Sequence, residues 1–256
     1  MASALRPSVC IDAVLADMPT PDALALIKEL GFDAFEFWCW WEKDINELVT
    51  LSQQHDLTIA ACCTKFISLV DPAARADYLA GLEASIAAAA KLSCKTLISQ
   101  VGDFLPGMPR EEQHASLVAG LQEAAQMLDG SDITLVIEPL NDQVDHPGYY
   151  LVRSDEAFEI IDKVASPNIK VVFDIYHQQI SEGHLISNIT KNISKIGHFH
   201  AAGNPGRNEL TSGEIQYEAV FDAIRSTEYD GFVGLEYWPL EDPEKGLNAA
   251  KKMLTV

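Results

Sequence analysis

The sequence predicts a single-domain (β/α)8 TIM barrel, and three observations lead to this prediction. The chain has 256 residues, which is close to the usual length of one such barrel. Eight short runs rich in β-branched and aromatic residues alternate with eight longer runs of helical periodicity. No GxGxxG sequence follows the first short run, which disfavours a two-domain dinucleotide-binding enzyme. Because no linker or low-complexity segment interrupts the alternation, we expect residues 1–256 to form one domain.

The expected strands are the short runs, and eight strands are the number that closes such a barrel. In chain order they are 8–14 (SVCIDAV), 34–38 (AFEFW), 57–63 (LTIAACC), 96–101 (TLISQV), 134–140 (TLVIEPL), 169–175 (IKVVFDI), 196–203 (IGHFHAAG) and 231–238 (GFVGLEYW).

The expected helices alternate with these strands and carry apolar residues at helical spacing, with charged residues at the outer positions. They are 21–30, 43–55, 73–92, 110–128, 155–164, 182–194, 214–226 and 243–252. Thr20, Asp71 and Asp242 each precede a proline, and we expect their side chains to cap the helix that follows. Gly31 and Gly231 each follow an expected helix and precede a strand.

Composition and charge exclude several classes of function. The chain carries 18 Lys and Arg against 38 Asp and Glu, a net charge of −20, so we expect neither nucleic acid nor an anionic membrane as a partner. We find no apolar run long enough for a membrane span and no signal-peptide core. Five cysteines lie scattered without a CxxC pair, which is typical of reduced thiols and predicts a cytoplasmic protein. They are Cys10, Cys39, Cys62, Cys63 and Cys94.

Four polar residues stand at the ends of the last four expected strands. They are Glu138, Asp174, His200 and Glu236. In a barrel of this kind the strand ends meet at one mouth, where the chemistry takes place. One such carboxylate alone would commonly cap a helix or pair with a cation, but three together would repel one another unless they shared a metal ion. An oxygen-rich set with one imidazole suits Mn²⁺, Mg²⁺ or Co²⁺, so we predict one bound divalent metal ion.

The C-terminal half of the chain resembles a known family in six segments. They are IEPLN (137–141), PGYYL (147–151), SPNIKVVFDIYH (166–177), GHFHAAGNPGRNEL (197–210), SGEIQY (212–217) and YDGFVGLEYWP (229–239). In these segments the sequence resembles the hydroxypyruvate isomerase family of the xylose isomerase-like barrel superfamily. The N-terminal half shares the alternating pattern of segments and GFDAFEF (31–37).

The resemblance implies roles for the residues at the strand ends. Glu138, Asp174 and Glu236 match metal ligands of the family, and Glu138 and Glu236 also match its catalytic acid/base pair. At the fourth ligand position, hydroxypyruvate isomerases usually have Gln where this chain has His200. The related ketose 3-epimerases have His there. His200 is therefore compatible with metal binding, but it does not decide between an oxo acid and a ketose as the substrate.

The resemblance also places His177 and Arg207 in contact with substrate oxygens. We expect His177 in the loop after the sixth strand, where its ring offers a donor to a hydroxyl or carbonyl. The forked guanidinium of Arg207 suits a carboxylate and favours an oxo acid over a neutral sugar. The alternative for Arg207 is a salt bridge to Glu209 or Glu214.

Other residues near the expected mouth have two interpretations each. Gln100 and Glu36, at the ends of the fourth and second strands, either orient the substrate or form local hydrogen bonds. His198 is expected to form hydrogen bonds one layer deeper than the strand end. The WCWW segment, residues 38–41, has three interpretations: it forms a wall of the site, packs beneath its own loop, or contacts another subunit. The last of these would make the protein a homo-oligomer.

The function that we expect is a metal-dependent isomerase acting on a small hydroxy-oxo acid. It would move a proton between carbons adjacent to a carbonyl through an enediolate, as in the conversion of hydroxypyruvate to tartronate semialdehyde. A ketose 3-epimerase using the same residues is the alternative, and a non-catalytic barrel that binds sugar acids is a further one. A metal-dependent repair endonuclease of the same superfamily is disfavoured by the net charge of −20.

Overall fold

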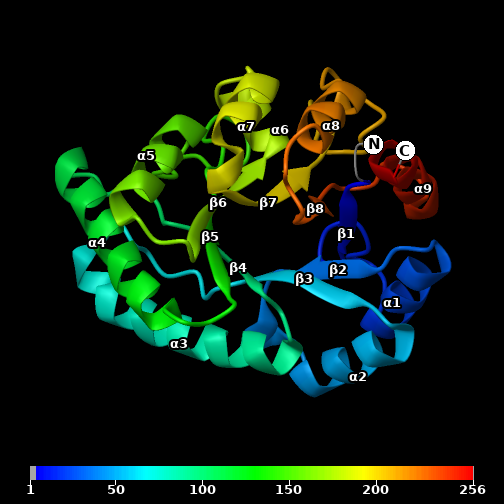
Figure 1. Ribbon diagram of the computed structural model, residues 1–256, viewed down its shortest axis with the longest axis horizontal. Coiled ribbons are helices and arrows are strands. Elements are labelled where there is room, and N and C mark those ends of the chain that lie inside the picture. The colour runs from blue at the N-terminus through cyan, green and yellow to red at the C-terminus, as the bar shows by residue number, and fades with distance from the viewer. Residues whose placement is uncertain (1–3, 256) are drawn as a thin grey trace.

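The computed structural model describes residues 4–255, and these residues form a closed barrel of eight parallel strands (Figure 1). Residues 1–3 and 256, which belong to the predicted single domain, lie outside the described residues. The strands are β1 (Arg6–Cys10), β2 (Ala34–Phe37), β3 (Thr58–Cys63), β4 (Thr96–Ser99), β5 (Thr134–Ile137), β6 (Ile169–Asp174), β7 (Ile196–Ala201) and β8 (Phe232–Leu235). The barrel closes where β1 pairs with β8, from Arg6 opposite Phe232 to Val9 opposite Leu235. The predicted fold class is therefore confirmed.

The helices form an outer ring around the strands, as Figure 1 shows. They are α1 (Thr20–Glu29), α2 (Ile45–His55), α3 (Arg75–Leu92), α4 (Arg110–Leu128), α5 (Ser154–Val164), α6 (Ile175–Ser181), α7 (Leu185–Asn192), α8 (Tyr217–Arg225) and α9 (Pro243–Thr255). Short 3-10 turns occur at Trp40–Glu42, Pro72–Ala74 and Ile193–Lys195. Within residues 4–255, no helix combines the length and the apolar character that a membrane crossing needs.

Along each strand, successive side chains point to opposite faces of the sheet, and both faces are buried. Leu97, Leu135 and Val171 belong to the large core between the sheet and the helices. Ile98 and Val136 belong to a small cluster of the opposite face, inside the barrel. All five cysteines are free, as predicted, and only Cys39 is not fully buried.

The strands are shorter at the mouth than the sequence predicted. β5 ends at Ile137 and β8 ends at Leu235, so the polar residues that follow stand on the first residue of a loop. The first strand covers 6–10 instead of 8–14, and the chain then turns. One reason is Asp12, because its carboxylate accepts from the backbone N–H of Trp38 at 2.8 Å. That N–H is then not available for a backbone hydrogen bond that would extend the pairing of β1 with β2.

Two of the three predicted caps are confirmed. Asp71 accepts from the backbone N–H of Ala73 at 2.9 Å, and Asp242 accepts from that of Glu244 at 3.0 Å. The prediction for Thr20 is wrong, because α1 already includes this residue and no side chain caps it.

The segment after β6 also differs from the prediction of one helix over 182–194. The chain enters α6 at once at Ile175, and α7 follows after a turn at Gly183, whose φ is +64°. Asp174 explains the early start, because its Oδ1 accepts from the backbone N–H groups of Tyr176 and His177 at 2.8 and 3.1 Å.

Candidate active site

The four polar residues predicted at the strand ends meet at the C-terminal mouth of the barrel. Glu138 directly follows β5, Asp174 ends β6, His200 lies in β7 and Glu236 directly follows β8. All four are buried, and each offers a ligand atom within 4.8 Å of the others. The parallel strands β5 to β8 lie next to one another in the barrel, so their ends bring together Glu138 and Glu236, which are nearly a hundred positions apart in sequence.

Asp174 combines two functions in one carboxylate. Its Oδ1 caps α6, while its Oδ2 faces the mouth at 3.6 Å from Nε2 of His177 and 3.9 Å from Nη2 of Arg207. Burial raises the pKa of Asp174 above its ordinary value, although Arg207 and His200 act in the opposite direction. Asp174 therefore caps a helix and also belongs to the cluster of possible metal ligands.

The two glutamates have different partners. Oε1 of Glu138 lies 3.1 Å from Nδ1 of His200, and Oε2 lies 3.4 Å from the side-chain amide of Gln100. Burial, the largest single effect, acts to raise the pKa of Glu138, but the hydrogen bond with His200 and the charges of His200 and His177 together hold that pKa below its ordinary value. Glu236 accepts from the indole N–H of Trp38 at 2.7 Å and from the guanidinium of Arg207.

His200 stands between the carboxylates, and their negative charges act on its ring. Burial acts to lower its pKa, yet the charges of Glu236 and Glu36 and the hydrogen bond with Glu138 raise the pKa well above its ordinary value. Positive charge at this point is therefore strongly favoured by the surrounding carboxylates. The donor set of three carboxylates and one imidazole fits a hard divalent cation by its chemistry.

His177 lies in the first turn of α6, so the prediction that it stands in a loop is wrong. Its Nδ1 receives the backbone N–H of Asn141 at 3.3 Å and lies 2.7 Å from the side-chain amide of that residue. Nδ1 thus acts as an acceptor, which leaves the proton on Nε2. Burial, with Arg207 nearby, lowers the pKa of His177 to about 3, so its ring is neutral at pH 7. Among the described residues Nε2 has no hydrogen-bond partner, and it remains available to donate.

Arg207 extends from the loop between β7 and α8 and reaches into the carboxylate cluster. Its partners are Glu236 and Asp174, not the residues suggested by the alternative interpretation. Glu209 accepts from the backbone N–H of Leu240, and Glu214 accepts from the side chain of Asn204. Burial acts to lower the pKa of Arg207, but the surrounding carboxylates, Glu236 first, raise it.

A cavity of about 570 Å³ opens above the cluster. Its lining includes Gln100, Glu138, Arg207 and Glu236, together with aromatic side chains. The rings of Trp38 and Trp238 meet edge to face with their centroids 6.0 Å apart and form part of the wall. A cavity of this size accommodates a small sugar or sugar acid.

The sequence did not reveal three of the contacts that shape the site. The indole of Trp38 binds Glu236, Asn141 fixes the ring of His177, and Glu36 lies behind His200. The signal for Trp38 was present in principle, since a buried indole N–H needs an acceptor. His198 forms a hydrogen bond inside the barrel, with Glu36, as predicted.

Comparison with known proteins finds relatives over most of the chain. The family model described as xylose isomerase-like TIM barrel matches residues 24–255. The hydroxypyruvate isomerase of Escherichia coli (strain K12) is 37% identical over 228 residues, which cover 86% of this chain and 88% of that protein. A 2-oxo-tetronate isomerase of Cupriavidus necator is 32% identical over 242 residues, covering 91% and 92%.

A solved structure shows the same fold over nearly the whole chain. The protein described as AP endonuclease, family 2, from Brucella melitensis superposes with a TM-score of 0.90 at 27% identity, covering 95% of this chain and 96% of that one. The extent of these matches shows that the chain belongs to the xylose isomerase-like TIM barrel family, as a member of its hydroxypyruvate isomerase branch of aldose–ketose type isomerases.

Proposed function

We propose that this protein is a metal-dependent isomerase of a small hydroxy-oxo acid, of the type that converts hydroxypyruvate to tartronate semialdehyde. The observation that carries the proposal is the buried cluster of three carboxylates and one imidazole, two of the carboxylates being glutamates, beneath a cavity of sugar-acid size. Glu138, Asp174, His200 and Glu236 would hold one divalent ion, either Mn²⁺, Mg²⁺ or Co²⁺. When bound, the ion supplies the positive charge that lowers the cost of an enediolate.

The two glutamates would carry the proton. Glu138 and Glu236 reach the mouth from β5 and β8 and so approach a substrate in the cavity from two sides. One carboxylate removes the proton from the carbon beside the carbonyl, and the same or the opposite one returns a proton to the neighbouring carbon. Hydrogen bonds from Gln100 and Trp38 orient these carboxylates.

Arg207 and His177 would bind the substrate oxygens. Arg207 lines the cavity and offers a fork of donors that matches a carboxylate. His177 is neutral and keeps its Nε2–H, so it donates to a hydroxyl or carbonyl without bringing a charge. Two relatives, the hydroxypyruvate isomerase of Escherichia coli and the 2-oxo-tetronate isomerase of Cupriavidus necator, bear the names of enzymes that act on oxo acids, which supports this choice of substrate class.

A ketose 3-epimerase is the second candidate, and His200 favours it. The same proton abstraction followed by return of the proton to the other face of the same carbon gives epimerisation instead of isomerisation. The net charge of −20 disfavours a DNA substrate, because a phosphate backbone would be repelled.

The deciding experiment follows the products by proton NMR in D2O. The Mn²⁺-loaded enzyme is incubated with hydroxypyruvate and, separately, with fructose and its C3 epimers, and Mn²⁺ is removed before the spectra are recorded. Formation of tartronate semialdehyde supports the oxo-acid isomerase. Conversion of the ketoses alone would instead make the protein a sugar epimerase or isomerase.

Two variants test the assignment of the acid/base pair. Glu138→Gln and Glu236→Gln should each abolish turnover, a loss of about 10²–10⁴-fold or more. Circular dichroism checks that the fold survives, and the metal content of each sample separates loss of the base from loss of the ion. Near wild-type turnover in either variant would contradict the mechanism.

A further inference from the structure

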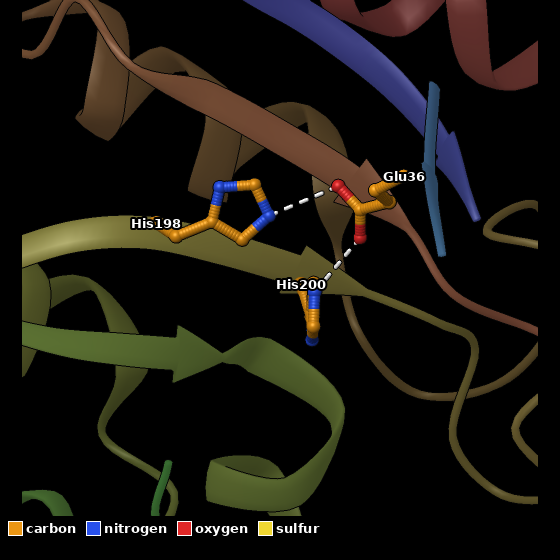
Figure 2. Close-up of side chains that lie close together, drawn as sticks. All are labelled: Glu36, His198 and His200. Carbon is orange, nitrogen blue, oxygen red and sulfur yellow. Dashed lines mark hydrogen bonds and ion pairs between the residues drawn. The ribbon is translucent and has the colours of Figure 1, made fainter. Parts of the chain in front are cut away.

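A second group of buried polar side chains shares His200 with the proposed metal site, and Figure 2 shows its members Glu36, His198 and His200. Glu36 stands at its centre: Oε1 lies 2.9 Å from Nε2 of His200, and Oε2 lies 3.0 Å from Nε2 of His198. The hydroxyl of Ser8 also donates to Oε2, at 2.5 Å. All four residues are at most 2% exposed, so these contacts are shielded from bulk solvent.

The neighbouring strands leave room for Glu36 to reach His200. The strand order β7-β8-β1-β2 places β8 and β1 between the two residues. Gly234 of β8 is paired in register with His200 on one side and with Ser8 on the other. A Cβ atom at Gly234 would overlap Oε1 of Glu36 and come within 2.7 Å of the His200 ring. The close contact between Glu36 and His200 thus depends on a glycine at this point.

The two nitrogens of His200 face different groups. Nδ1 lies 3.1 Å from Oε1 of Glu138 and 3.6 Å from Oε2 of Glu236, at the mouth. Nε2 faces Oε1 of Glu36, inside the barrel, in a close ion pair that lacks the alignment of a hydrogen bond. A bare lone pair on Nε2 would be repelled by a carboxylate at 2.9 Å, so Nε2 carries a proton. The nitrogen that is able to give up its proton to a cation is then Nδ1, which already points at the carboxylates.

We propose that Glu36, held in place by His198 and Ser8, is a positioning residue that keeps the proton on Nε2 of His200 and presents Nδ1 as a metal ligand. The inference deepens the proposed function, since it rests on His200 being a ligand at the mouth. Carboxylates that accept from a ligating histidine fix its ring and its tautomer, and their loss costs about 10–100-fold in metal affinity.

The same three side chains have a competing interpretation as a second metal site. Glu36, His198 and His200 bring three ligand atoms within 4.8 Å of one another. The contacts favour positioning, because Oε2 of Glu36 already accepts from both Ser8 and His198. Binding of two Mn²⁺ ions per chain by the wild-type protein would overturn the positioning role.

The affinity test uses Glu36→Gln, which keeps the size of the side chain and places an amide NH2 among three donors. Titration of the metal-free protein with Mn²⁺, with free ion counted by electron paramagnetic resonance, should give a Kd about 10–100-fold higher than in the wild type. Ser8→Ala removes one donor to Oε2 and leaves the contact to His200, so its Kd should rise less.

A double-mutant cycle separates positioning from a general structural effect. In a His200→Gln background there is no imidazole for Glu36 to orient, so Glu36→Gln should then change the Kd for Mn²⁺ by less than about twofold. An equal loss of affinity in both backgrounds would overturn the proposal. Thermal unfolding of each variant checks that it is folded.

A spectroscopic readout tests the proton position itself. Long-range ¹H–¹⁵N correlation of the Mg²⁺-loaded, ¹⁵N-histidine-labelled protein should show His200 protonated at Nε2, and Glu36→Gln should alter this signature. Protonation at Nδ1 in the wild type would overturn the proposal. If the wild type binds no divalent ion, the proposed function fails; the same spectrum of the metal-free protein at high pH then judges the role of Glu36 separately.

Discussion

Arg207 is the cation that lines the described cavity, and in the proposed site it would distinguish a substrate with a carboxylate from a neutral sugar. Arg207→Lys retains the charge and loses the forked pair of donors, so kcat/KM for hydroxypyruvate should fall about 10–100-fold, as expected for hydrogen bonds to a charged group. Fructose, which has no carboxylate, serves as the matched control. If the enzyme turns fructose over, kcat/KM for fructose should fall much less than kcat/KM for hydroxypyruvate. Steady-state kinetics with both substrates make the comparison. An equal loss on both would assign Arg207 to the carboxylates of Glu236 and Asp174 instead of the substrate.

Tyr78 gives a prediction about alkaline stability. Burial raises its pKa from about 10 to about 12, although its hydrogen bond with Ser99 acts in the opposite direction. Because the folded pKa lies above the unfolded one, the unfolded chain loses its proton first. The stabilisation is therefore complete below pH 10 and is lost as pH rises from 10 to 12, by about 3 kcal/mol. Urea unfolding between pH 8 and 12 measures this, and Tyr78→Phe should show a smaller decline over that range.

At the residue scale, the sequence revealed the groups on strand ends but not their pairing across the barrel. Glu138, Asp174, His200 and Glu236 were recognisable because each ends a short apolar run, and a buried carboxylate there needs a partner. The contact between Trp38 and Glu236 joins residues 198 positions apart. No local pattern encodes such a contact, since it depends on which strands become neighbours when the barrel closes.

The strands were predicted correctly in number and order, whereas one helix was missed and the ends of several elements were placed wrongly. The eight strands were found because each apolar run is short and the helical runs between them are long. The error after β6 has a physical cause in Asp174, which was expected as a ligand and also acts as the N-cap of α6. That cap moves the helix forward and carries His177 into its first turn instead of a loop.

The loop that presents Arg207 gives a prediction at the scale of an element. Gly213, with φ of +95°, packs so closely on Asn204 that a Cβ would overlap the Asn204 carbonyl oxygen. The backbone hydrogen bond from Glu214 to Asn204, at 2.7 Å, closes this loop. Gly213→Ala should push the loop open, displace Arg207 and lower kcat/KM by about 10²-fold, the cost of a misplaced group in a preorganised site.

A matched variant controls for the strain of the left-handed backbone alone. Gly130, with φ of +73°, follows α4 and has no atom within 4 Å of the position of a Cβ. Gly130→Ala should cost about 1–2 kcal/mol of stability and leave kcat/KM unchanged. Equal kinetic effects of the two substitutions would contradict a role of the loop in placing Arg207.

At the scale of the whole molecule, the decisive feature is the closure of the barrel. Closure of the barrel between β1 and β8 places the N-terminal strand beside the last one, and the backbone N–H of Leu5 binds the carbonyl of Leu254 at 3.0 Å. Figure 1 shows β1 close to α9, the last helix, and the two elements are in contact. The alternating pattern of the sequence predicted a barrel, but only this pairing of the first and last strands distinguishes it from an open sheet.

The net charge of −20 and the proposed metal site make separable predictions for the stability of the whole molecule. Mn²⁺ at 100 times its Kd should stabilise the folded state by about 2.7 kcal/mol. For a chain of this size that raises Tm by several degrees, roughly 2–4 °C per kcal/mol. Asp174→Asn should abolish this gain while preserving the helix, because an asparagine side chain caps α6 equally well through its oxygen.

Scanning calorimetry with and without Mn²⁺ measures the effect, and NaCl at equal ionic strength controls for screening of the surface charge. A rise in Tm that NaCl reproduces, or that Asp174→Asn retains, would mean that Mn²⁺ acts on the acidic surface and not at the mouth of the barrel.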